Sequence, residues 1–172
     1  AQLVSFKLGD SEDEKGRPLE LVRARAAGPW PLGLVGPDLA PLPLADALFT
    51  VEEARDGAGN PELRFDYSGP LGAARKVVRA TGAGLLALEV ETATPGWGLV
   101  LGPGLRNPTA EELEDRALPR SAVYRAAGEL EVLAAGGAEE LVAVRGGDVA
   151  WAGVEDNYFL SVVVPDTPLE EV

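Results

Sequence analysis

The stretch from residue 147 to residue 165, GDVAWAGVEDNYFLSVVVP, decides the fold of this chain. It predicts one strand over residues 148–153, a polar turn, and a second strand over residues 158–164 that Pro165 ends. Successive residues of a strand face opposite sides of the sheet, and apolar side chains fall on both sides of the second strand. Two apolar faces are typical of the interior of a sheet system, so this strand is predicted to lie in the middle of one.

Short strands separated by glycine-rich turns are predicted along the rest of the chain. The alternation is clearest where Leu63, Phe65 and Tyr67 are predicted to face inward, with polar residues between them facing outward. Residues 28–43 are rich in proline and are predicted to cross the sheet as an extended loop without regular pairing. Strands at such intervals indicate a sandwich or barrel. The other predicted strands are 3–8, 17–24, 47–53, 75–81, 85–92, 121–126, 128–134 and 139–145.

A single short helix is predicted to begin at Thr109. Thr109 and Glu112 have the spacing of a capping box, in which each side chain accepts a hydrogen bond from the main chain of the other residue. Leu113 is the predicted apolar anchor of this helix, and Pro119 sets its limit. The chain is therefore predicted to be all-β with one short helix.

Length, charge and composition narrow the possible functions. The chain has 172 residues, which suits a single domain over residues 1–172, and no apolar run is long enough to cross a membrane. Its formal net charge of −13 opposes binding to nucleic acid. With no cysteine and no histidine, the chain lacks thiolate and imidazole ligands and the commonest general base. We therefore expect a monomer with no cofactor, no metal and no nucleic-acid partner.

Three local patterns that resemble functional sites are better explained as turns. The acidic run at residues 10–14 lacks the glycine and the bidentate glutamate of a calcium loop. The glycines within residues 95–104 lack the lysine and the directly following helix of a phosphate-binding loop. Asp148, Glu155 and Asp156 fall at predicted strand ends, where solvated carboxylates are ordinary. No catalytic pair is expected among them.

The aromatic residues of the closing stretch leave two alternatives open. Trp151, Tyr158 and Phe159 could form a stacking platform for a sugar or a peptide, or they could pack in the core. Core packing is favoured because large aromatic residues in apolar strands are ordinarily buried.

The closing stretch and three earlier segments resemble one protein family. The closing motif is carried by Trp151, Gly153, Asp156, Tyr158, Phe159 and Pro165. The earlier segments, in the order expected for the family, are LVSFKL at 3–8, GRPLELV at 16–22 and WGLVLGPGL at 97–105. Together they are similar to the extracytoplasmic domain of bacterial YidC-type membrane protein insertases.

The resemblance implies a fold, a function and a location. The fold would be an antiparallel β-supersandwich, of the kind also found in sugar mutarotases, without catalytic residues. The domain would be an accessory interaction module in the insertion and folding of membrane proteins, with or without the Sec translocon. Its partners would be SecD and SecF, the SecYEG translocon and substrate membrane proteins. Its place would be the periplasmic side of the bacterial inner membrane, as part of a multi-pass protein.

The alternative function is that of a carbohydrate-binding or mutarotase-like extracellular β-sandwich. Mutarotases use histidine with a carboxylate, so the absence of histidine counts against the enzymatic form of this alternative.

The charge balance also bears on lipid binding, because anionic headgroups attract basic segments. The one basic cluster in the sequence is interspersed with acidic residues. We therefore expect no direct lipid binding by this domain. The cluster consists of Arg106, Arg116, Arg120 and Arg125.

Overall fold

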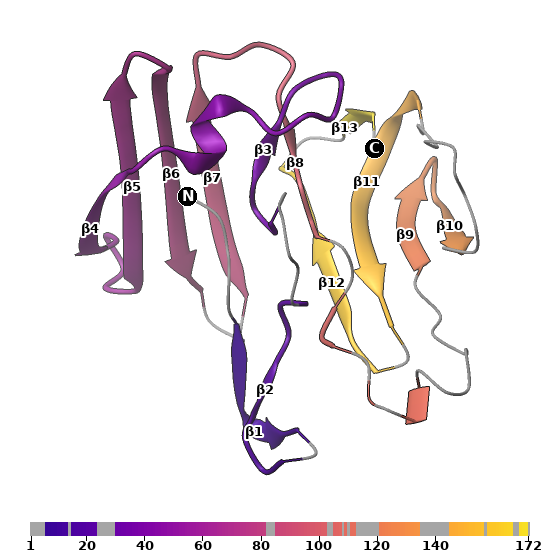
Figure 1. The fold of residues 1–172 in the computed structure, drawn as a ribbon. Helices are drawn as coiled ribbons and strands as arrows, with labels where there is room; N and C mark the ends of the chain where they lie inside the picture. Colours follow the sequence, from indigo (N-terminus) through magenta and orange to yellow (C-terminus); the bar gives the residue numbers. More distant parts are fainter. Residues whose placement is uncertain are drawn as a thin grey trace. The chain divides into compact units, whose positions relative to one another are not determined.

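Antiparallel strands account for most of the regular structure in the computed structural model of the chain (Figure 1). The chain divides into two compact units, which are described separately. Unit 1 is Leu32–Val100 with Ala1–Gln2, and unit 2 is Leu3–Pro31 with Leu101–Val172. The structure describes residues 6–13, 15–23, 30–81, 85–102, 105–107, 109, 111–112, 121–134, 145–156, 158–166 and 169–171.

Unit 1 contains a four-stranded antiparallel sheet in which each strand pairs with the next one along the chain. Its strands are β4 (Thr50–Arg55), β5 (Pro61–Gly69), β6 (Gly72–Ala80) and β7 (Leu86–Thr92). Asp56 shapes the turn between β4 and β5, because its Oδ1 accepts hydrogen bonds from the main-chain N–H groups of Ala58 and Asn60. The strands on either side of this turn form an antiparallel hairpin.

The alternation correctly predicts which side chains of β5 share a face, but the predicted burial is wrong for Leu63, which is 40% exposed. Leu63, Phe65 and Tyr67 share one face, and Phe65 lies opposite Lys76 of β6 in the register. The Lys76 ammonium donates a hydrogen bond to the main-chain oxygen of Leu32, in the proline-rich segment. On the same face, Phe49 packs against Tyr67 with ring centroids 5.7 Å apart. The apolar face therefore contacts the segment that precedes β4.

That proline-rich segment contains regular pairing, so the prediction of a wholly unpaired loop is wrong. Strand β3 (Leu34–Val35) pairs with β8 (Gly98–Leu99), and the 3-10 helix η1 (Pro43–Asp46) follows β3. Leu34, Val35 and Leu44 are buried. Proline blocks a long ladder but leaves room for two paired residues between Pro31 and Pro37. Strand β8 lies among the glycines of residues 95–104.

Unit 2 contains a sheet in the order β10-β9-β11-β12, in which β13 also pairs with β11. These strands are β9 (Ser121–Ala126), β10 (Glu129–Ala134), β11 (Arg145–Glu155), β12 (Leu160–Val163) and β13 (Leu169–Glu171). A separate hairpin consists of β1 (Lys7–Glu12) and β2 (Pro18–Glu20). The acidic run, predicted to be a turn, begins within β1 and reaches the loop of the hairpin at Asp13. Asp13 orders that loop by forming an ion pair with Arg17 at 2.7 Å.

The second strand of the closing stretch differs from its prediction in length and in place. Tyr158 and Phe159 belong to the turn, because Asp156 Oδ1 accepts both of their main-chain N–H groups at 2.8 Å. The strand is therefore shortened to β12. Among the described residues β12 pairs with β11 alone, so it is an edge strand and the predicted central position is wrong. Apolar alternation fixes which side chains share a face but not how many neighbours a strand has.

The predicted capping box is confirmed. Glu112 Oε2 accepts the main-chain N–H of Thr109 at 2.8 Å, and Thr109 Oγ1 accepts that of Glu112 at 3.2 Å. Leu113 and Pro119, to which the prediction assigned the apolar anchor and the limit of this helix, lie outside the described residues, as does most of the strand predicted at 139–145.

The predicted all-β class with antiparallel sheets is confirmed. Within the part of the chain that is described, no helix has the length and apolarity to span a bilayer. The single domain over residues 1–172 stays a prediction.

Candidate functional site

Arg106 connects three segments of unit 2 that lie far apart in the sequence. Its main-chain N–H donates to the oxygen of Leu21 at 2.8 Å, next to an isolated bridge between Val22 and Leu105. Its φ is 35°, a value that L-residues rarely adopt. The strained backbone and the long-range pairing fix where the Arg106 side chain begins.

The Arg106 guanidinium is buried between two carboxylates. Nη1 and Nη2 donate to the two oxygens of Glu112 at 2.9 and 2.5 Å, the forked geometry that binds a carboxylate most strongly. Nε lies 3.0 Å from Asp156 Oδ2, an ion-pair contact whose angle does not make a hydrogen bond. The Tyr158 ring lies 5.1 Å from the guanidinium carbon, within the range of a cation–π contact. We call Arg106, Glu112, Asp156 and Tyr158 the arginine node.

The electrostatics of the arginine node favour the fully charged state. The fork from Arg106, with a further hydrogen bond from the Thr109 main chain, lowers the pKa of Glu112 to about 2. The same fork raises the pKa of Arg106 against the opposing effect of burial. Two carboxylates around one guanidinium leave a formal charge of −1. A buried cation held between two carboxylates in this way holds segments together.

The structure brings two of the six residues of the closing motif into the arginine node. Asp156 and Tyr158 contact Arg106, whereas the other four lie on or beside the β11–β12 hairpin. Trp151 and Gly153 lie on β11, and Gly153 is buried. Phe159 lies in the turn and Pro165 follows β12, and both are half-buried. Arg106 and Glu112 were missed as partners of this motif. Their contacts join residues that no local pattern relates.

Gly153 holds β11 and β12 close together. A Cβ at this position would lie 2.7 Å from Val162 Cγ1 and would also collide with the main-chain oxygen of Ser161. Gly153 and Val162 are direct partners in the antiparallel register. The glycine of the closing motif therefore has a packing role.

The structure bears on whether the three aromatic residues of the closing stretch pack in the core or are exposed. Tyr158 is 72% exposed, so the prediction of core packing is wrong for this ring. Trp151 and Phe159 are half-buried. Tyr158 lies over the Arg106 guanidinium, so its ring has a partner within the chain.

Arg106, the first residue of the predicted basic cluster, does not lie on the surface. Arg106 is 6% exposed and paired with acids. Arg125 is exposed on β9, and Arg116 and Arg120 lie outside the described residues.

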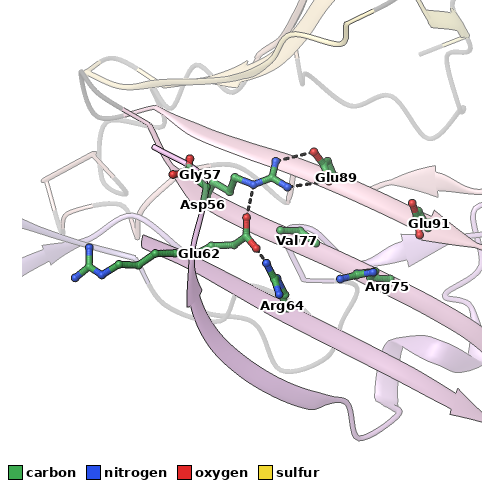
Figure 2. A pocket seen from close by; sticks show the side chains of 10 residues that line it. Asp56, Gly57, Glu62, Arg64, Arg75, Val77, Glu89 and Glu91 are labelled. Carbon is green, nitrogen blue, oxygen red and sulfur yellow. Dashed lines mark hydrogen bonds and ion pairs between the residues drawn. The ribbon is translucent and has the colours of Figure 1, made fainter. Parts of the chain in front are cut away.

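Unit 1 carries a hollow of about 580 Å³ on the charged face of its sheet (Figure 2). Arg79 crosses this face: its Nη1 and Nη2 bind Glu89 at 2.6 and 3.0 Å, and its Nε binds Glu62. Arg64 binds the other oxygen of Glu62 at 2.5 Å. The full lining is Arg55, Asp56, Gly57, Glu62, Arg64, Arg75, Val77, Arg79, Glu89 and Glu91.

The charges of this hollow largely satisfy one another. Four arginines and four carboxylates line it, so their formal charges cancel. Hydrogen bonds from Arg64 and Arg79 hold the pKa of Glu62 below its usual value, against the effect of burial. Glu62 is 4% exposed, although the alternation predicts that it faces solvent. Cross-strand ion pairs of this kind stabilise the register of β5, β6 and β7.

Within the described part of the chain, no group of three or more acidic residues could hold a metal ion. Comparison of the whole chain with protein-family models, with curated proteins and with solved structures gives no match.

Proposed function

We propose that this chain is an extracytoplasmic interaction module of a YidC-type membrane protein insertase. The supporting observation is that each of the four segments that carry the resemblance has residues in unit 2, where they are connected in series. Segment 3–8 pairs with segment 16–22 in the β1–β2 hairpin, where Lys7 lies opposite Glu20. Segment 16–22 meets segment 97–105 at the bridge between Val22 and Leu105. The next residue, Arg106, contacts the closing motif.

A single folded arrangement would account for a resemblance carried by segments that lie far apart in the sequence. Each segment alone is an ordinary apolar strand or glycine turn. Next to the place where they meet, a residue with positive φ has its guanidinium buried between two carboxylates. The role we propose is non-catalytic. It consists of binding SecD, SecF or the SecYEG translocon, and substrate membrane proteins, at the periplasmic side of the inner membrane.

The first test is the reading frame that encodes this chain. An insertase requires a bundle of membrane helices, each about 20 apolar residues long, after this domain. We expect five such hydrophobic segments downstream of codon 172. A frame that continues into carbohydrate-active or other soluble domains would contradict the proposal.

The second test is a binding measurement on the purified chain. SecD–SecF and SecYEG, each in detergent, are passed over the immobilised chain, with a panel of common oligosaccharides in parallel. We expect saturable binding of at least one Sec complex and none of the sugars. Saturable sugar binding without Sec binding would favour the carbohydrate-binding alternative instead.

A further inference from the structure

Among the described residues, strand β12 is an edge with no charge, proline or bulge within it, although it is only four residues long. Residues 158–164 read YFLSVVV, seven residues without charge, glycine or proline. Natural proteins guard exposed edges with charged residues, proline or bulges, because unpaired main-chain groups accept another strand. Segments of this composition also have high β-propensity and low charge. An unguarded edge of this kind indicates a partner.

The register shows which main-chain groups of β12 point away from β11. Asp156 and Phe159 are joined by a hydrogen bond from Asp156 N–H to Phe159 oxygen at 2.9 Å, at the start of the β11–β12 ladder. Bonded and non-bonded pairs alternate along an antiparallel ladder. The pairs Leu160–Glu155 and Val162–Gly153 are then non-bonded. The N–H and C=O groups of Leu160 and Val162 therefore point outward.

The side chains of the same residues form an exposed apolar row. Leu160, Val162 and Val164 are 56%, 42% and 68% exposed. Across the sheet, Val162 shares its row with Gly153 and Val123. An incoming strand could therefore pair with the outward main-chain groups and pack its apolar side chains against this row.

Among the described residues, β10 forms the opposite edge of the sheet, and this edge is guarded. Leu130 and Val132 are exposed there, but Glu129 and Glu131 alternate with them and are also exposed. Repeated charges on an edge strand oppose pairing. The contrast between the two edges singles out β12.

The surroundings of β12 favour a basic partner. Glu155 pairs with its first residue, and exposed Asp166 follows its end. The nearby arginine node has a formal charge of −1, and the chain as a whole carries −13. Complementary charge speeds association and discriminates against like-charged partners.

We propose that β12 binds an extended apolar peptide segment with basic flanks by strand addition. The inference goes beyond the proposed function and does not rest on it, since an open edge of this composition would bind such a segment in any context.

The test uses hydrogen exchange of the whole chain, followed by NMR. The probe is a synthetic peptide in which valine and threonine alternate over about six residues, with a pair of lysines at each end. We expect exchange of the Leu160 and Val162 amides to slow by about tenfold or more when the peptide is added. Protection of these amides before the peptide is added would show that the edge is already occupied, by the chain itself or a second copy, and would overturn the proposal.

Two control peptides separate strand addition from nonspecific adhesion. N-methylation of alternate residues removes the donors of one edge and is expected to weaken binding by about tenfold or more. Glutamates in place of the lysines are expected to weaken binding at low salt, with the difference shrinking as salt is added. Equal binding of all three peptides would contradict strand addition.

A pair of variants localises the site. Leu160→Lys places a charge on the β12 edge at an exposed position and is expected to reduce peptide binding about tenfold or more. Leu130→Lys, at a position 62% exposed on the opposite edge, is the matched control and is expected to bind normally. Equal loss in both variants, or in neither, would overturn the assignment to β12. Binding of Sec complexes by Leu160→Lys would still test the proposed function separately.

Discussion

Replacement of Arg106 by leucine tests the arginine node directly. The change leaves Glu112 and Asp156 as carboxylates with side chains only 14% and 12% exposed and no cation between them. Removing one partner of a buried ion pair costs about 3–5 kcal/mol. Because both carboxylates keep some contact with water, we expect Arg106→Leu to lower the free energy of unfolding of unit 2 by about 3 kcal/mol at pH 7.

The loss is read from hydrogen exchange of the β9 and β11 amides, which reports on unit 2 separately. Arg125→Leu is the matched control, since Arg125 is exposed and its side chain makes one long hydrogen bond, to the Gly128 oxygen at 3.4 Å. A surface change of this kind is expected to cost less than about 0.5 kcal/mol. If Arg106→Leu cost no more than Arg125→Leu, the node would not hold unit 2 together.

The same variant has a defined pH dependence. The pKa of Glu112 is lowered to about 2 from 4.5, so its stabilising contribution is present above about pH 4.5 and is lost as the pH falls through 2. The difference between wild type and Arg106→Leu should therefore shrink over that range. A difference that stays constant down to pH 2 would contradict the assignment of Glu112 as the main partner of Arg106.

Three further predictions concern single positions. Gly153→Ala should lower stability by about 1–3 kcal/mol in chemical denaturation, because the new methyl meets Val162 and the Ser161 oxygen; a neutral result would mean that the strands separate freely. Burial lowers the pKa of Lys76 to about 8, so stability should rise between about pH 8 and 10.5, and Lys76→Met should abolish that slope. Glu62→Gln should destabilise unit 1 at neutral pH more than Glu91→Gln, and the difference should shrink in acid. Equal effects of the two changes would contradict the bridging role of Glu62.

Local patterns predict local structure in this chain. The capping box of Thr109 and Glu112 forms as predicted because both partners lie within one helical turn. The alternation on β5 likewise predicts which side chains share a face. The sequence does not reveal which part of the chain packs against each face of a strand.

The missed features depend on register and on long-range contacts. Glu62 is buried because Arg79 and Arg64 lie over it, and this requires knowing that Glu62 stands opposite Arg79 in the ladder. Arg106 looks like one of four surface arginines until its contacts with Asp156 and Tyr158 are known. The edge position of β12 follows from the order of strands in the sheet, which its two apolar faces do not determine.

The chain leaves unit 2 after Pro31 and returns to it after Val100. Main-chain hydrogen bonds hold these two ends of unit 1 together. The Leu32 N–H donates to the Val100 oxygen at 2.7 Å, and the Val100 N–H to the Gly33 oxygen at 2.9 Å. Before unit 1 folds, bringing Val22 to Leu105 means closing a long flexible loop, with its entropic cost. Once unit 1 has folded, the same two residues are separated by a short tether. We therefore expect the inserted sheet to form first, and the β1–β2 hairpin, although synthesised earlier, to contact Leu105 only afterwards.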